Sequence, residues 1–249
     1  EYLTLNNGVR MPMLGYGTIG QAGEQITDNV AFALHHGYEL IDTANRYGNE
    51  VEVGQGLKKS GLKRKDYFLE TKLGPTLYAN ETAIDGTLQR LDVDTIDLMI
   101  LHHPVNNYQH AYGMLEKAYK AGKLRAIGVS NFPVEKLQEL LDHCEIPPMV
   151  MQVEGHPYYP AEAVKAFCDA HHIVLQCWYP LGHGSSELLQ DPVIGEIAQA
   201  HGKSPAQVVL RWHIQMGFCP VPGSKSPAHI QENGEIFDFS LSQEEMDRM

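Results

Sequence analysis

The sequence lacks the features that would place the protein in a membrane or nucleic-acid class. No apolar run among its 249 residues approaches the roughly 18–20 residues that a membrane span needs, and residues 1–7 lack the basic and apolar regions of a signal peptide. Lys and Arg number 19 against 31 Asp and Glu. The formal net charge of -12 disfavours a surface for nucleic acid or anionic lipid, since both need clustered cations. We therefore expect a cytoplasmic protein with no nucleic-acid or membrane partner.

Cysteine is scarce, and neither it nor histidine has the spacing of a metal site. The four cysteines, Cys144, Cys168, Cys177 and Cys219, form no C-x-x-C pair and are interpreted as reduced thiols. The 13 histidines include three adjacent pairs and no H-x-H. Neighbours in a strand point to opposite faces, and neighbours in a helix diverge by about 100°, so such pairs rarely bind one ion. The sequence predicts no metal site.

Short apolar runs alternate with segments of helical periodicity along the whole chain. After a predicted hairpin over residues 2–11, strands are expected at 13–16, 39–41, 67–70, 95–101, 126–129, 149–153, 173–177 and 218–221. Helices are expected at 25–35, 49–60, 81–91, 111–121, 133–143, 160–171 and 205–215, with an additional helix at 192–200. This alternation indicates parallel βαβ units of the α/β class. Eight strands predict a (β/α)8 TIM barrel that forms one domain over residues 1–249.

Polar side chains follow three consecutive predicted strands at intervals of 30 residues. They are Asp42, Lys72 and His102. Because barrel enzymes carry their chemistry at the carboxyl ends of the strands, we expect these side chains to meet at one mouth of the barrel. Tyr47 lies in the loop after the second strand, from which it can face Lys72 and His102.

These four side chains suit the protonation of an alkoxide as it forms. A phenol with a pKa of about 10 is a poor acid at neutral pH. A nearby ammonium stabilises the phenolate, so Lys72 is expected to lower the pKa of Tyr47. Asp42 would hold Lys72 charged, and His102 would donate a hydrogen bond to a carbonyl oxygen as negative charge develops. Because no side chain donates hydride, the site implies a cofactor.

A glycine-rich segment offers an alternative interpretation. Residues 15–20 read Gly-Tyr-Gly-Thr-Ile-Gly and match G-x-G-x-x-G, with Glu39 and Asp42 about twenty residues further on. That arrangement is typical of a Rossmann dinucleotide-binding fold. A glycine-rich turn at the end of the first barrel strand explains the same residues, and the series Asp42, Lys72 and His102 favours the barrel.

Five ordered segments of the chain closely resemble the aldo-keto reductases. They are residues 41–50, 69–73, 97–104, 128–132 and 221–233, and the resemblance runs from the hairpin nearly to the C-terminus. It implies an NAD(P)H-dependent oxidoreductase that reduces aldehydes or ketones to alcohols, acting as a monomer on a small-molecule carbonyl substrate. By this resemblance Asp42, Tyr47, Lys72 and His102 match the catalytic tetrad, with Tyr47 as the general acid.

The resemblance also implies which residues hold the cofactor and the substrate. Ser130, Asn131 and Gln152 match the residues that bind the nicotinamide carboxamide, and Trp178 matches the aromatic ring that stacks on the nicotinamide. The further predicted cofactor contacts are Gly17, Thr18, Ile19, Asp42, Pro180, Leu181, Ser224, Lys225, Ser226, His229, Glu232 and Asn233. Ile19, Tyr47 and His103 are expected to line the substrate pocket.

The phosphate-binding segment departs from the NADP(H) pattern of the family. That pattern has Lys ahead of the serine and Arg five residues after it, where this chain has Gly223 and His229. Lys225 could replace one cation, and Ser226 could donate a further hydrogen bond. Charge-assisted contacts to phosphate are strong. We therefore expect NADP(H) to bind. The preference for NADP(H) over NAD(H) is expected to be narrower than the family pattern would give, which leaves NAD(H) as a second cofactor.

The pocket also departs from the family. His103 and Ile19 stand where Trp is frequent, which predicts a less aromatic wall and a smaller or more hydrophilic carbonyl substrate. The chain stops at Met249 without the long C-terminal loop of many family members, so either specificity is relaxed or the natural chain continues.

Two other functions fit some of these residues. One is a nicotinamide-binding redox sensor with little turnover, and the other is a cofactor-free hydrolase or isomerase using His102 and Asp42.

Overall fold

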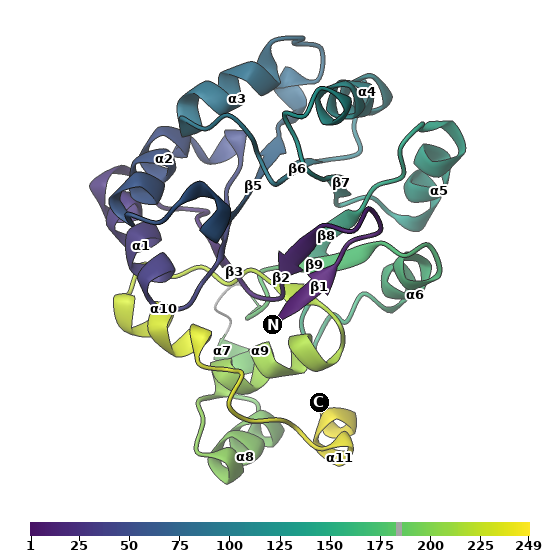
Figure 1. The fold of residues 1–249 in the computed structure, drawn as a ribbon. Helices are drawn as coiled ribbons and strands as arrows, with labels where there is room; N and C mark the ends of the chain where they lie inside the picture. Colours follow the sequence, from purple (N-terminus) through teal and green to yellow (C-terminus); the bar gives the residue numbers. More distant parts are fainter. Residues whose placement is uncertain (183–185) are drawn as a thin grey trace.

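Eight parallel strands form the barrel predicted from the sequence (Figure 1). The structure is a computed structural model that describes residues 1–182 and 186–249. Each strand pairs with its neighbours in chain order. The strands are β3 (Gly15–Gly17), β4 (Leu40–Asp42), β5 (Phe68–Leu73), β6 (Leu98–Leu101), β7 (Ile127–Ser130), β8 (Val150–Glu154), β9 (Val174–Trp178) and β10 (Cys219–Pro220). All eight lie at or within a few residues of their predicted positions.

Glycine lets the first and last strands approach each other. The N–H of Gly17 donates to the carbonyl oxygen of Pro222 at 2.9 Å, and a Cβ on Gly17 would lie 2.7 Å from the carbonyl oxygen of Val221. No other residue fits at that distance. A Cβ on Gly15 would lie 2.9 Å from a methyl carbon of Val221, directly after β10, and 2.5 Å from a methyl carbon of Leu40 on β4. These two glycines of the G-x-G-x-x-G match therefore serve barrel closure, and the strand order excludes the Rossmann alternative.

Helices surround the barrel, and all eight predicted ones are present. They are α1 (Gly23–His35), α2 (Glu50–Lys59), α3 (Ala83–Leu91), α4 (Tyr108–Lys120), α5 (Val134–His143), α6 (Glu162–Ala170), α8 (Pro192–His201) and α9 (Pro205–Gln215). The start of α9 shows why such predictions succeed. Pro205 occupies its first turn, and Ser204 and Gln207 form a capping box around it.

Several short elements were not predicted. They are α7 (Ser186–Leu189), α10 (Pro227–Gly234), α11 (Gln243–Arg248) and the 3-10 helices η1 (Asn45–Tyr47), η2 (Arg64–Asp66) and η3 (Pro75–Leu77). Each has at most eight residues, too few for a repeating apolar face. In α10, for example, Ile230 is the single buried apolar side chain. Local turn chemistry and packing, rather than periodicity, determine these elements.

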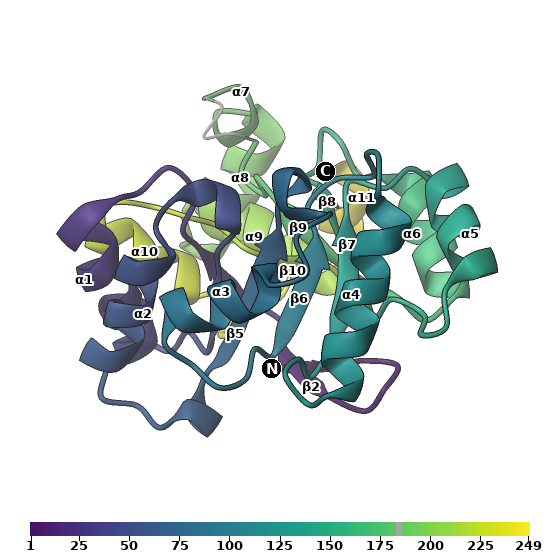
Figure 2. The same cartoon turned by 90° about the horizontal axis from the view of Figure 1, so that it is seen from above.

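The N-terminal hairpin lies across one end of the barrel. It consists of β1 (Tyr2–Thr4) and β2 (Arg10–Pro12), which pair antiparallel as predicted. Figure 2 shows it at the end of the barrel opposite α7. Leu5 directly after β1 and Met11 in β2 are buried. The hairpin therefore covers the amino ends of the strands and leaves the carboxyl ends for the candidate site.

The barrel strands are buried almost throughout, including several polar side chains. Every residue of β4, β5, β6 and β7 is buried. Asp42, Glu70, Lys72 and Gln152 are at most 3% exposed. Because a buried polar group without a partner is costly, these side chains must satisfy one another.

Two further properties of the described ranges bear on the sequence analysis. No helix in them combines the length and apolar character needed to cross a membrane. Nor do three or more His, Cys, Asp or Glu side chains there come close enough together to hold a metal ion. The four cysteines are free thiols.

Candidate active site

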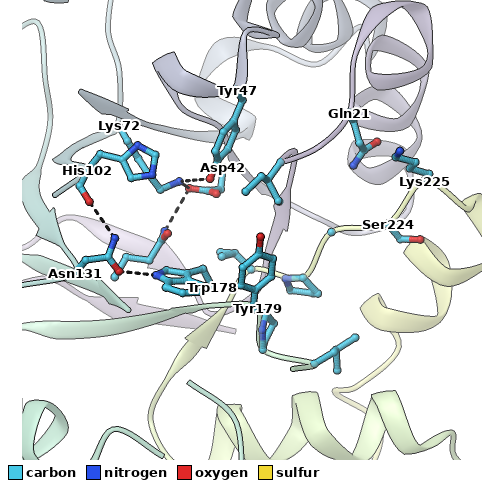
Figure 3. Close-up of a pocket in the computed structure, with 18 of the residues that line it drawn as sticks. Gln21, Asp42, Tyr47, Lys72, His102, Asn131, Trp178, Tyr179, Ser224 and Lys225 are labelled. Atoms are coloured by element: carbon cyan, nitrogen blue, oxygen red, sulfur yellow. Dashed lines mark hydrogen bonds and ion pairs between the residues drawn. The ribbon is translucent and has the colours of Figure 1, made fainter. Parts of the chain in front are cut away.

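A cavity of about 490 Å³ opens at the carboxyl ends of the strands (Figure 3). Residues from β3, β4, β5, β8 and β9 and from the loops that follow the strands form its wall. Most of the residues predicted from the sequence meet there: Gly17, Ile19, Asp42, Tyr47, Lys72, His102, His103, Asn131, Gln152, Trp178, Pro180, Leu181, Ser224 and Lys225. The cavity is therefore the candidate site for both cofactor and substrate.

Asp42 and Lys72 form a buried ion pair at the ends of β4 and β5. Lys72 Nζ lies 2.6 Å from Asp42 Oδ1, and the two side chains are 1% and 4% exposed. The strand register explains the contact, because Asp42 lies beside Glu70, and Lys72 points to the same face two residues further on. Burial alone would lower the pKa of Lys72, but the Asp42 carboxylate raises it above its ordinary value. Lys72 therefore stays charged at neutral pH.

The Tyr47 hydroxyl accepts a hydrogen bond from Lys72 Nζ at 3.2 Å (Figure 3). Burial raises the pKa of Tyr47, the Lys72 ammonium lowers it, and the Asp42 carboxylate raises it again, with a raised pKa as the net result. The expected effect of Lys72 has the correct sign, but the predicted net decrease is wrong because burial outweighs it. Tyr47 is thus a neutral phenol at neutral pH, the form that can donate a proton.

His102 is a neutral imidazole beside Tyr47. The ring centroids lie 6.1 Å apart in an edge-to-face arrangement. Burial and the Lys72 ammonium lower the pKa of His102 to about 3. Its Nδ1 is buried and has no hydrogen-bond partner among the described residues. Since a neutral imidazole carries one donor and one acceptor nitrogen, His102 can donate a hydrogen bond without carrying charge.

Asn131 connects two histidines and a tryptophan in one wall of the cavity. Its Nδ2 donates to the backbone oxygen of His102 at 3.0 Å and lies 3.3 Å from His103 Nδ1. Its Oδ1 accepts from Trp178 Nε1 at 2.9 Å. The His103 ring stacks on His102 with centroids 4.6 Å apart. These contacts fix the plane of the indole and the orientation of both imidazoles.

Gln152 offers an acceptor that no group in the described part of the chain uses. Its Nε2 donates to Gln176 Oε1 at 2.8 Å and lies 3.3 Å from Asp42 Oδ1. Its Oε1 is buried and has no hydrogen-bond partner within residues 1–182 and 186–249. Ser130 lies behind it, with the hydroxyl donating to the Gln152 backbone oxygen at 2.9 Å. A primary amide such as the nicotinamide carboxamide would satisfy Oε1, so these residues fit that group.

Ser224 and Lys225 line the cavity ahead of α10 (Figure 3). Tyr16 holds the loop from inside, because its hydroxyl donates to the Ser224 backbone oxygen at 2.8 Å. The Lys225 side chain is exposed. Ser226 caps α10, its side chain accepting from the N–H of His229 at 3.4 Å. An exposed cation beside a helix N-terminus suits a phosphate group.

Six predicted cofactor residues do not line the cavity: Thr18, Ser130, Ser226, His229, Glu232 and Asn233. Thr18 instead supports the site from behind, since its N–H and hydroxyl both donate to the Asp42 backbone oxygen, at 3.1 and 3.0 Å. Glu232 and Asn233 lie on α10, where Asn233 is buried.

Five cavity residues were missed by the sequence analysis: Gln21, Tyr179, Val221, Pro222 and Gly223. Tyr179 and Gly223 adjoin predicted residues in the chain, and Val221 and Pro222 lie in the segment 221–233 that carries the family resemblance, so their place in the sequence could have revealed them. Gln21 is different. It is 4% exposed and accepts hydrogen bonds from Tyr16 and Asn29, and nothing in the sequence points to it.

Comparison with known proteins relates the whole chain to one family. The sequence profile of the Aldo/keto reductase family matches residues 13–249. The chain is 44% identical to the glyoxal reductase of Bacillus subtilis (strain 168), covering 100% of this chain and 91% of that protein. It is 38% identical to the 2,5-diketo-D-gluconic acid reductase B of Corynebacterium sp. (strain SHS752001), covering 98% and 90%. A crystal structure of an aldo/keto reductase from Brucella melitensis superposes with a TM-score of 0.95 at 37% identity, covering 100% and 97%.

Proposed function

Because the chain belongs to the aldo/keto reductase family and is an NAD(P)H-dependent oxidoreductase acting on carbonyls, we propose that it reduces small polar aldehydes and ketones, with NADPH as the preferred cofactor and Tyr47 as the general acid. The observation that supports Tyr47 is its hydrogen bond with a lysine that is itself paired to a buried carboxylate. The sensor alternative is not favoured, because the relatives are named as reductases.

Proton donation follows from the contacts of Tyr47. The phenol holds its proton at neutral pH, since burial raises its pKa. As a substrate oxygen takes that proton, negative charge passes to the phenol oxygen, 3.2 Å from the Lys72 ammonium. Asp42 keeps Lys72 charged and oriented. The charge therefore develops beside a fixed cation in a site shielded from water, where electrostatic stabilisation is strong.

The remaining cavity residues orient the reactants. When bound, the nicotinamide supplies the hydride. Gln152 Oε1 would accept from its carboxamide, and the indole of Trp178, held by Asn131, would lie against its ring. His102 would donate to the substrate carbonyl oxygen and fix it beside the Tyr47 hydroxyl.

The substrate end of the cavity supports a small polar compound. His103 places an imidazole in the wall, and Ile19 is 45% exposed at the rim. The glyoxal and diketogluconic acid reductases among the relatives are named for compact polar dicarbonyl compounds. We therefore propose small dicarbonyl compounds as the first substrates to test. The measurement is the rate of NADPH and NADH oxidation with glyoxal and with an activated aromatic aldehyde. Absence of turnover with all of them, despite nucleotide binding, would contradict the proposed function.

The pH profile of kcat/KM is expected to be flat from about pH 5 to pH 9. Tyr47 acts in its protonated form, so activity falls as pH rises through a pKa that burial places above its ordinary value of 10.0. His102 acts as neutral imidazole, so activity falls only as pH drops toward about 3. Initial rates in constant-ionic-strength buffers measure the profile, and an acidic limb near pH 6.5, the ordinary pKa of histidine, would contradict the role given to His102.

Acid unfolding must be separated from this profile. The folded-state pKa of His102 is depressed, so protonation favours the unfolded state once the pH falls below about 6.5, and stability declines from there toward pH 3. Circular dichroism at each pH provides the control for the kinetic measurement.

Substitution of Lys225 by alanine is expected to lower kcat/KM for NADPH about tenfold and to change the value for NADH less than about twofold. The reason is that the adenosine 2′-phosphate would lose a charge-assisted contact that NADH does not make. Lys63→Ala, which removes another exposed lysine, is the matched control. Equal losses with the two nucleotides would show that Lys225 does not discriminate between them.

A further inference from the structure

A third carboxyl lies in the barrel interior beside the Asp42–Lys72 pair. Glu70 is 0% exposed and sits on β5, two residues before Lys72. In the register between β4 and β5 it is the direct partner of Asp42. Alternate residues of a strand share a face, so Glu70 and Lys72 point to the same side. The mechanism described above does not use Glu70.

Glu70 is held by two glutamines from the far side of the barrel. Gln176 Nε2 donates to Glu70 Oε1 at 2.7 Å, and Gln152 Nε2 lies 3.3 Å from Glu70 Oε2. The two glutamines are register partners on β8 and β9, and both are 0% exposed. Glu70 therefore connects β5, which carries Lys72, to β8, which carries Gln152.

These contacts decide which way the Gln152 amide faces. Its Nε2 has three acceptors within 3.3 Å, on Asp42, Glu70 and Gln176. If the amide were turned over, its oxygen would face those same three oxygens, and each approach would be repulsive. The amide nitrogen is thus fixed inward, and Oε1 is left as the buried acceptor without a partner in the described part of the chain.

The charge of the cluster is consistent with this arrangement. Burial and the neighbouring Asp42 carboxylate raise the pKa of Glu70 well above its ordinary value. A hydrogen bond between the Glu70 and Asp42 side chains also raises the pKa of Glu70, so a proton on Glu70 lies toward Asp42 and both Glu70 oxygens still accept from the glutamine amides.

We propose that Glu70 is a positioning residue, which fixes the Gln152 amide from below so that Gln152 Oε1 faces the nicotinamide carboxamide. This inference rests on the proposed function, because it concerns the nicotinamide end of the same cavity. Glu70 is therefore expected to affect the binding of the nicotinamide part of the cofactor and not that of the adenosine part.

Glu70→Gln tests the proposal at nearly constant volume. The new side-chain NH2 offers Gln152 Oε1 an inward partner, so the amide can turn over. We expect the dissociation constant for NADPH, measured by titration calorimetry, to rise about tenfold. The dissociation constant for 2′,5′-ADP, which has the adenosine phosphates but no nicotinamide, is expected to stay unchanged.

Asp97→Asn is the matched control, since Asp97 is a buried carboxyl near the other end of the barrel, paired with Arg64 and Arg125. It should shift neither constant. Equal weakening of both nucleotides by Glu70→Gln, or no change in either, would overturn the proposal while leaving the proposed function intact. Failure of the wild-type protein to bind NADPH or NADH would instead overturn the function itself.

The wild-type protein gives a second measurement that does not depend on the variant folding. The Glu70 carboxyl has an infrared stretching band whose position depends on its hydrogen bonds. That band is expected to shift when NADPH is added and to stay in place with 2′,5′-ADP. Equal shifts with the two ligands, or no shift with either, would overturn the proposal.

Discussion

Replacement of Tyr47 by phenylalanine is expected to lower kcat/KM for carbonyl reduction by about 10³-fold, within the range that general acid catalysis contributes. The ring remains, so packing against His102 is preserved. The hydroxyl that accepts from Lys72 and donates the proton is lost. The rate of NADPH oxidation with a saturating aldehyde measures the effect. The dissociation constant for NADPH should stay within about twofold, because the hydroxyl is assigned to the substrate and not to the cofactor.

Tyr119→Phe is the matched control for this experiment. It removes a phenol hydroxyl that accepts from Asn7 Nδ2 at 3.3 Å and does not line the cavity, so its rates should match those of the wild type. If Tyr47→Phe retained a tenth or more of the wild-type rate, a water molecule or His102 would have to be the acid, and the proposed mechanism would fail.

Substitution of Lys72 by methionine is expected to remove both activity and much of the stability. Asp42 would keep a carboxylate that is 4% exposed without its ammonium partner, and breaking a buried pair in this way costs about 3–5 kcal/mol. Urea unfolding followed by circular dichroism measures the loss. The pKa of Lys72 is raised in the folded state, so its contribution to stability is fully present below its ordinary pKa of 10.5 and is lost only at higher pH. Urea unfolding at neutral pH therefore measures the full contribution of Lys72 to stability.

The double variant Asp42→Asn with Lys72→Met separates the two roles of the pair. With both charges removed, no buried carboxylate is left unpaired, and most of the lost stability should return. Activity should not return, because Tyr47 still lacks a cation to stabilise its phenolate. A single Lys72→Met variant as stable as the wild type would show that the pair contributes little to folding. Recovery of turnover in the double variant would refute the electrostatic role of Lys72.

The barrel could be predicted because its signals are local. Each strand is a short apolar run, and a helix of nine or more residues shows a repeating apolar face. Helix α10 was missed because its buried apolar contact is a single residue, Ile230, and its start depends on a serine cap and a proline. The glycines at 15 and 17 suggested a phosphate loop, and the structure uses them to bring the first and last strands together. That role depends on Val221 and Pro222, which are far from both glycines in the chain.

The meeting of the tetrad could also be predicted, because its regular spacing corresponds to one strand and one helix. Asp42 and Lys72 come together at 2.6 Å for the reason given by the sequence, namely that parallel strands end at the same mouth. The roles of the cofactor residues remain predictions. Those that line the cavity, such as Trp178 and Lys225, could be recognised from their motifs, whereas Gln21 could not, because its contacts come from side chains on other elements.

The sequence alone determined the order of strands and helices, the family, and the four side chains at the carboxyl ends. Those properties follow from periodicity and from the spacing of residues along one chain. Only the tertiary structure decided the direction of the Tyr47 pKa, the neutral state of His102 and the place of Glu70 beneath Gln152. The physical reason is that desolvation and charge depend on distances between groups up to 110 residues apart, such as Gln152 and Asp42, and those distances exist only once the barrel has closed.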